Sequence, residues 1–126
     1  MPIVNNDEIP EIPWRNNYRK WNIVSDGDGT TSTSLSLSKV GTGAGAPLHK
    51  HADDEIIVIL EGQLEVKIGN ETTLVDSNHT LVVPPNIPHA FKNLGPGEAK
   101  LLTFFPVRNP FDNTLFLEGL PPSSIT

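Results

Sequence analysis

Cysteine is absent from this sequence. Its absence excludes disulfide bonds, thiolate metal sites and a cysteine nucleophile, so any metal chemistry must depend on histidines and carboxylates. A chain without cysteine also fits a reducing compartment.

Long apolar runs and an export signal are absent as well. The longest apolar run covers residues 56–60, whereas a membrane-spanning helix needs roughly 20 apolar residues. Residues 1–8 contain neither the basic region nor the apolar region of a signal peptide. We therefore expect a cytoplasmic protein with no membrane partner.

The chain is also poor in basic residues. Nine Lys and Arg against 15 Asp and Glu give a formal charge of -6, and the basic residues are scattered along the chain. Nucleic-acid binding begins with a basic surface that neutralises phosphates. Nucleic acid is therefore not an expected partner.

Helical periodicity is missing too, because no stretch places apolar residues at i, i+3, i+4 and i+7 over three turns. Instead, 12 Pro and 10 Gly divide the 126 residues into short segments, as in proteins built from short strands and tight turns. This length allows one core but not two. We predict one all-β domain spanning residues 1–126.

The two ends of the chain lack strand patterning. Residues 1–13 contain three prolines, and we interpret them as an extended N-terminal arm anchored by Trp14. Residues 119–126 are interpreted as a loose tail. Residues 25–29 are rich in Asp and Gly, which predicts a turn.

Residues 31–40 alternate strictly between two kinds of side chain, with Leu35 and Leu37 on one face and serines on the other. This period of two predicts a half-buried strand. Two orientations remain open. Either the leucines fill the core, or they pack on a neighbouring subunit while the serines face the cavity.

Further strands are predicted downstream, each bounded by turn residues. They cover residues 55–60, 63–68, 72–75, 81–83, 89–93 and 99–105. The turns at 61–62 and 69–70 are short, which predicts two successive hairpins.

Two histidines and a glutamate follow the glycine-rich segment 41–45. His49 and His51 are separated by one residue, a spacing that places both rings on the same face of a strand. Six residues of straight strand cover roughly 20 Å, whereas metal ligands must converge on one point. The chain must therefore turn before Glu55, and residues 52–54 predict that turn within a local hairpin.

A third histidine, His89, follows the proline cluster at residues 84–88. The prolines restrict the backbone and exclude a central strand until Pro88 has passed. A restricted backbone of this kind fixes the direction of the side chain that follows it. We interpret His89 as a fourth ligand.

Taken together, these residues resemble two motifs of the cupin superfamily. The first is matched by Gly43, His49, His51, Glu55 and Gly62. The second is matched by Asn78, Pro84, Asn86, His89 and Asn93. The resemblance covers residues 30–110.

The resemblance implies a double-stranded β-helix, or jelly-roll barrel, with residues 30–110 as its core. It also implies one divalent transition metal held by His49, His51, Glu55 and His89. Three imidazoles and one carboxylate suit Fe, Mn, Ni, Zn, Co or Cu, and the ligands do not select among them.

Two positions depart from the family pattern, because Asn78 and Asn86 stand where the family usually has glycine. Asn tolerates a left-handed backbone better than other non-glycine residues, so the turns can be retained. His79 lies on a predicted turn, where we expect it to be exposed and outside the site.

The walls of the pocket are expected to be mainly apolar. Phe91 and one of Phe104 and Phe105 are predicted to line it, with Asn93 making a hydrogen bond in a turn. Lys39 and Arg15 are expected to be solvated.

Two classes of function fit these observations. One is a metalloenzyme acting on a small oxygen-bearing organic substrate, by oxygenase chemistry or by Lewis-acid lyase, isomerase or cyclase chemistry. In it, Glu55 is expected to act also as a general base. The other is a non-catalytic module that binds or senses a small ligand.

A homodimer is expected in either case. The N-terminal arm and the exposed sheet edges of a small barrel favour exchange of an N-terminal strand between two copies.

Overall fold

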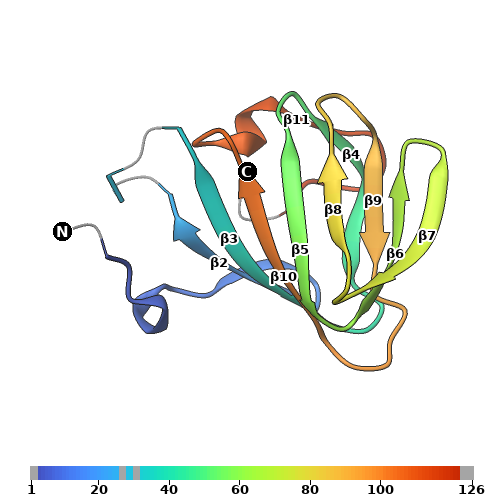
Figure 1. The fold of residues 1–126 in the computed structure, drawn as a ribbon, viewed down its shortest axis with the longest axis horizontal. Helices are drawn as coiled ribbons and strands as arrows, with labels where there is room; N and C mark the ends of the chain where they lie inside the picture. The colour runs from blue at the N-terminus through green and yellow to red at the C-terminus, as the bar shows by residue number, and fades with distance from the viewer. Residues whose placement is uncertain (1–2, 26–27, 30–31, 123–126) are drawn as a thin grey trace.

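The computed structural model describes residues 3–25, 28–29 and 32–122. Figure 1 shows two antiparallel sheets that face each other. In the first sheet the order is β1 (Ile12–Arg15), β2 (Tyr18–Val24), β3 (Ser34–Val40), β10 (Ala99–Phe105), β5 (Glu55–Glu61) and β8 (Thr80–Val83). In the second sheet it is β11 (Thr114–Phe116), β4 (Gly45–His51), β9 (His89–Lys92), β6 (Gln63–Ile68) and β7 (Glu71–Asp76).

This architecture confirms the predicted all-β jelly roll. Two short 3-10 turns, η1 (Asn6–Glu8) and η2 (Pro110–Asn113), are the other regular elements among the described residues. In this part of the chain, no helix has the length and apolarity that crossing a membrane requires.

The strands predicted downstream of residue 54 are present with small changes at their ends, but only one of the two predicted hairpins is. β6 pairs with β7, whereas β5 and β6 belong to different sheets. The turn between them carries the chain across the barrel. Gly62 is required there, because its φ is 86° and a Cβ would lie 2.8 Å from the Cα of Ala99.

The predicted hairpin between His51 and Glu55 is likewise a crossing between sheets. β4 pairs with β9 and β11, while β5 pairs with β10 and β8. Turn residues indicate that the chain reverses, but they do not determine whether the next strand pairs with the last one or joins the opposite sheet.

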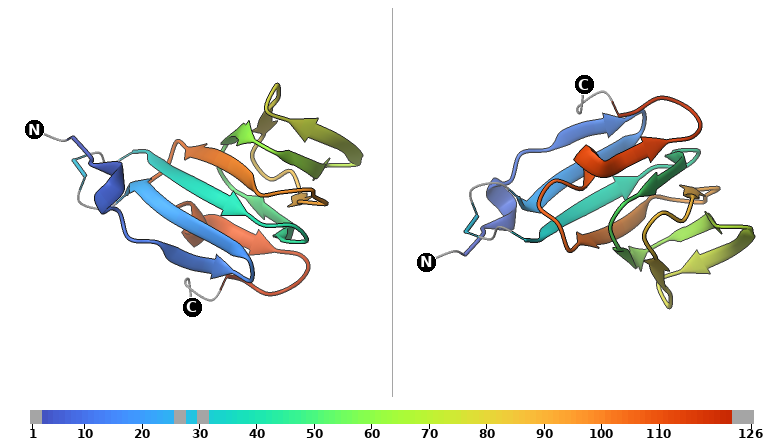
Figure 2. Two further views of the ribbon diagram at one scale, coloured as in Figure 1. Left: turned by 90° about the horizontal axis from the view of Figure 1, so that it is seen from below. Right: turned by 90° about the horizontal axis from the view of Figure 1, so that it is seen from above.

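The predicted N-terminal arm, residues 1–13, leads into a hairpin that begins at Ile12. β1 and β2 form a hairpin that pairs with β3 of the same chain. Figure 2 shows this hairpin beside the C-terminal segment. Trp14 is the expected anchor, since it is buried and packs on Phe111 with ring centroids 4.8 Å apart.

The C-terminal segment also packs against the barrel. The Arg15 guanidinium donates a hydrogen bond to the carbonyl of Leu120 at 2.7 Å, and Pro122 is fully buried. Within the predicted tail, Leu120 and Pro122 therefore contact the rest of the chain, and residues 123–126 lie outside the described residues. The predicted turn at 25–29 lies partly outside them as well.

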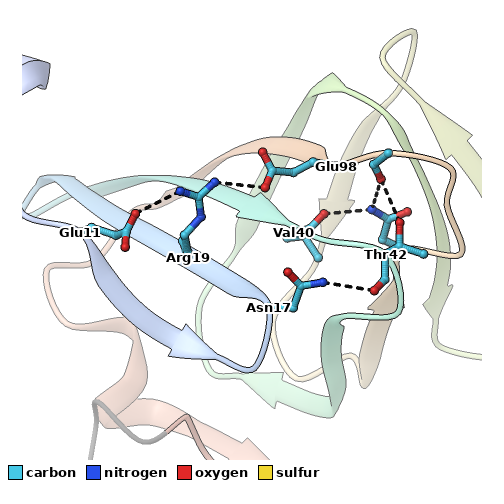
Figure 3. Close-up of polar contacts among 8 residues, drawn as sticks. Glu11, Asn17, Arg19, Val40, Thr42 and Glu98 are labelled. Carbon is cyan, nitrogen blue, oxygen red and sulfur yellow. Dashed lines mark hydrogen bonds and ion pairs between the residues drawn. The ribbon is translucent and has the colours of Figure 1, made fainter.

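Loops at one end of the barrel are tied together by amide side chains. The Asn93 amide donates to the carbonyls of Val40 at 2.9 Å and Gly97 at 2.8 Å, and its oxygen accepts from the amide of Gly95 at 2.8 Å. This confirms the predicted structural role of Asn93. Nearby, Asn17 donates to the carbonyl of Thr42 (Figure 3).

A charged bridge covers the outside of the same end. Arg19 on β2 contacts Glu11 at 3.2 Å and Glu98 at 3.1 Å, linking the start of the chain to the loop before β10 (Figure 3). All three side chains are close to half exposed, so solvent screens the bridge and it contributes little to stability.

The two orientations considered for residues 31–40 are resolved by β3, which begins at Ser34. Ser36 and Ser38 are buried between the sheets, and Leu35 and Leu37 are partly exposed on the outer face. The serines therefore face the interior. On β10, the neighbour of β3, Phe105 points inward and Phe104 outward.

A candidate metal centre

A bulge in β4 sets the direction of the His49 side chain. Along the ladder with β9, Ala46 pairs with Phe91 and His49 pairs with His89, so Pro47 and Leu48 together oppose a single residue. Proline cannot donate to a ladder, and a bulge re-aims the side chain that follows it. As a result, Ala46 and His49 both line the same cavity.

The bulge brings three imidazoles together. His49 and His89 lie opposite each other on neighbouring strands, with ring centroids 4.1 Å apart. The ring of His51 lies 4.9 Å from that of His49 and 5.1 Å from that of His89. All three rings are buried.

Glu55 reaches the same point from the opposite sheet, as the first residue of β5. Its Oε1 lies 2.9 Å from Nε2 of His89 and 3.6 Å from Nε2 of His51. The loop after β8 supports the crossing, because the amide of Asn86 donates to the carbonyl of His51 at 2.7 Å. Asn86 has a φ of 63°, the left-handed backbone expected of it.

Each imidazole is oriented by a partner on its other nitrogen. Nδ1 of His49 lies 2.6 Å from the carbonyl of Pro47, and Nδ1 of His89 lies 2.9 Å from that of Ile87. Carbonyls only accept, so both Nδ1 atoms carry the proton. The Nε2 lone pairs are left to face the site.

Thr114 performs the same function for His51. Its hydroxyl donates to the carbonyl of Pro110 at 2.8 Å, and its oxygen lies 2.6 Å from Nδ1 of His51. The single hydroxyl proton is already used, so Nδ1 of His51 must be the donor. A hydrogen bond on the second nitrogen is how metal-binding histidines are usually held.

The facing atoms form an unsatisfied cluster. One ligand atom from each of His49, His51, Glu55 and His89 lies within 4.8 Å of the other three. Nε2 of His51, Nε2 of His89 and Oε1 of Glu55 are buried without a hydrogen bond of good geometry. Buried polar atoms rarely lack partners, and nitrogen and oxygen donors of this kind suit a divalent transition metal. The four predicted ligands therefore form a possible metal site.

The ionisation of these side chains agrees with this arrangement. Burial, assisted by the neighbouring His89, lowers the pKa of His49 to about 4, so this ring is neutral at pH 7. Burial raises the pKa of Glu55, but His51 and His89 outweigh it and bring the pKa to about 2. Burial lowers the pKa of His89, and contact with Glu55 overcomes this and raises it. The cluster thus holds an anionic carboxylate among imidazoles.

The chamber around the cluster is small, about 40 Å³, and opens beside a larger cavity of about 380 Å³. Phe91 and Phe105 line the chamber, as predicted. The pocket is less apolar than expected, because its wall also carries polar side chains: Arg15, Tyr18, Lys20, Ser36, Ser38 and Thr103.

Two of these polar residues, Lys20 and Arg15, add positive charge to a site that was predicted without it. Lys20 was not identified from the sequence, and Arg15 was expected to be solvated. Nε and Nη2 of Arg15 are buried without hydrogen bonds, and its guanidinium lies over Phe116 at 5.5 Å. Lys39 does face outward, over the ring of Trp21.

The turn at residues 76–79 lies outside the site. His79 is exposed and contacts Asp76 at 3.0 Å, as expected for a surface turn. The amide of Asn78 donates to the same carboxylate at 2.9 Å, and the backbone of Asn78 is not left-handed.

Two facing antiparallel sheets with three histidines and one glutamate converging between them define a jelly-roll protein with a possible metal site. Residues 36–105, more than half of the chain, match the cupin domain family. The chain therefore belongs to the cupin family, which confirms the resemblance drawn from the two motifs.

Two curated proteins align with part of the chain. An uncharacterized protein of Methanocaldococcus jannaschii is 39% identical over 56 residues, which are 44% of this chain and 45% of that protein. Polyketide synthase CurC of Streptomyces cyaneus is 33% identical over 55 residues, 43% of this chain and 36% of that protein. The alignments thus span less than half the length of either relative.

Solved structures resemble the chain over more of its length. The polyketide cyclase RemF from Streptomyces resistomycificus has a TM-score of 0.78 at 21% identity, covering 95% of this chain and 87% of that chain. At this level of identity the likeness supports the fold alone.

Proposed function

We propose that this cupin is a metal-dependent enzyme acting on a small oxygen-bearing organic substrate. In this proposal His49, His51, Glu55 and His89 hold one divalent transition metal. The observation that carries it is the buried cluster of facing donor atoms, three of which have no hydrogen bond of good geometry. When bound, the metal supplies Lewis-acid chemistry, polarising a substrate oxygen.

Glu55 is the residue we propose as catalytic. It is the only anionic side chain of the cluster, and its pKa of about 2 keeps it ionised at neutral pH. An ionised carboxylate at this point can accept a proton from a substrate bound beside it during the reaction, as a general base does. The two nearby imidazoles stabilise its ionised form.

Support for an oxygen-bearing organic substrate comes from one relative. The aligned part of CurC, which is described as a polyketide synthase, covers 43% of this chain. The adjoining cavity of about 380 Å³ and its aromatic walls suit a small planar organic molecule.

A substrate screen with defined metals tests the proposal. Small enols, phenols and β-keto acids are incubated with metal-loaded protein in the presence and absence of oxygen. Turnover without oxygen supports the proposed Lewis-acid enzyme. Turnover only with oxygen indicates an oxygenase, and tight binding without turnover indicates a binding module.

Substitution of Glu55 separates catalysis from metal binding. Glu55→Gln is expected to retain a substantial part of the metal, because an amide oxygen still coordinates weakly, and to lose most of the activity. Metal analysis and rate measurements on the same preparation check this. Full activity in this variant would exclude Glu55 as the base.

We also propose that the protein is a homodimer, formed through the outer face of the first sheet. In the single chain β1 pairs with β2 and β2 with β3, and exchange of an N-terminal strand between two copies stays a prediction. The outer face offers a different reason, because its apolar side chains form two rows across the strands. The rows are Trp21, Leu37, Leu102, Val58 and Leu35, Phe104, Ile56, Val82.

Two of these side chains, Ile56 at 37% and Val82 at 65%, are exposed in the single chain, and the other six are partly buried. A second copy offers the same apolar surface, and sheet faces of this kind pack on each other in symmetric dimers. Light scattering is expected to give a dimeric mass for the wild type and a monomeric mass for Phe104→Lys. The exposed Leu115 on β11 provides the control Leu115→Lys. A monomeric wild type would contradict the proposal.

A further inference from the structure

Lys20 is a buried cation in the interior of the barrel. It lies on β2, is 6% exposed, and lines both the metal chamber and the larger cavity. Its Nζ lies 3.8 Å from the ring centroid of Trp14 and 4.4 Å from that of Phe111. The ammonium group is thus held between two aromatic faces.

This placement is unfavourable for stability. In the described part of the chain, no carboxylate lies within ion-pair distance of Nζ. The two cation–π contacts offset only part of the cost of removing an ammonium group from water. An apolar side chain of similar length would fill the same space without this cost. Stability therefore does not explain the lysine.

The surroundings of Lys20 suit an anionic ligand. The larger cavity is also lined by the more exposed charges of Arg108 and Asp112, but among the described residues that are buried in its wall Lys20 alone is charged. The wall shared with the metal chamber combines this cation with one hydroxyl and aromatic rings. The shared residues are Trp14, Lys20, Ser36, Phe105 and Phe111.

We infer that Lys20 is a specificity-determining residue that binds the carboxylate of a small planar organic acid. The Nζ and the Ser36 hydroxyl receive the carboxylate, the rings of Trp14, Phe105 and Phe111 hold the planar body, and the remaining oxygen of the substrate extends toward the four-residue cluster. This inference deepens the proposed function and rests on it, because the proposed function places the reacting oxygen of the substrate at the four-residue cluster.

Matched ligand pairs test the inference directly. Benzoate with benzamide, and cinnamate with cinnamamide, differ in charge but hardly in shape. Binding is measured by calorimetry to the metal-loaded protein and by the fluorescence of Trp14 in a Trp21→Phe background. A charge-assisted hydrogen bond is expected to give the wild type a preference of about tenfold or more for each carboxylate.

The variant Lys20→Met is expected to abolish this preference while retaining the wild-type metal content. Lys20→Arg is expected to retain part of it. Lys39→Met is the control, because Lys39 lies on the same sheet, faces outward and also contacts a tryptophan ring. It should leave the preference unchanged.

A structural role for Lys20 predicts different results. Lys20→Met would then unfold at a lower temperature than the wild type, whereas removal of an unpaired buried charge predicts equal or higher stability. The inference is overturned if the variant keeps the carboxylate preference, if it loses its metal, or if the wild type binds neither carboxylate. A His49→Ala variant that loses no metal would instead refute the proposed function.

Discussion

The interior of the barrel has two halves of opposite character. One half is an apolar core, in which Ile57, Ile59, Leu64 and Leu101 are at most 2% exposed. The other half holds buried histidines, a glutamate and a lysine. The same strands contribute to both halves, since β5 begins with Glu55 and continues with Ile57 and Ile59. Stability and chemistry are therefore separated along the strands rather than between domains.

The largest expected effect on stability comes from the apolar half. Leu101→Ala removes a fully buried side chain from β10, and the cavity it leaves is expected to lower the free energy of unfolding by about 2–5 kcal/mol. The metal content should be unchanged. Chemical denaturation measures the loss, with Leu115→Ala on the exposed side of β11 as the control. A large loss of metal in Leu101→Ala would show that the two halves are not independent.

In the polar half, replacing Lys20 is expected to raise the free energy of unfolding, opposite to the effect of Leu101→Ala. Burial lowers the pKa of Lys20 from 10.5 to about 8 in the folded chain. Below pH 8 the lysine is protonated in both states, and its burial is fully destabilising. Between about pH 8 and 10.5 the unfolded chain binds the extra proton, so stability rises with pH.

The size of this effect follows from the shift in pKa. A difference of about 2.5 corresponds to about 3 kcal/mol, so Lys20→Met should exceed the wild type in stability by as much as this near neutral pH. The gap should narrow toward pH 10, before Tyr18, whose pKa burial raises to about 12, titrates. Unfolding curves of both proteins, measured across this pH range, check the direction of the change. A difference in stability that widens as the pH rises would contradict it.

A smaller effect is expected outside the cluster, at the hydroxyl that orients His51. Thr114→Val keeps the shape of the side chain but removes the acceptor for Nδ1 of His51. Loss of such a partner typically lowers metal affinity about 10–100-fold. Competition with a chelator measures the change, and Thr72→Val on the exposed face of β7 serves as its control. Equal affinity in both variants would show that Thr114 does not support the site.

The halves also differ in how well the sequence predicts them. The four clustered residues are predictable because strand parity, a turn and the proline cluster constrain them locally, and the cupin motifs have the same spacing. Strands such as β6 are predictable from their apolar alternation. The bulge at Pro47 and Leu48 is not, because it depends on pairing with the distant strand β9.

Lys20 was missed for a physical reason. The inward-facing residues at the start of β2 are Tyr18, Lys20 and Asn22, so the strand lacks the apolar alternation by which a buried face is recognised. The serines of β3 present the same difficulty, because their burial depends on the cavity that they face. A polar cavity wall therefore resembles a solvated surface in the sequence.

Metal analysis tests the central claim most directly. The metal content of the dialysed wild type is compared by mass spectrometry with that of His89→Ala, which removes a buried member of the cluster, and His79→Ala, which removes an exposed histidine outside it. We predict about one divalent transition metal per chain in the wild type and in His79→Ala, and a steep loss in His89→Ala. Equal metal in all three proteins would contradict the assignment of the site.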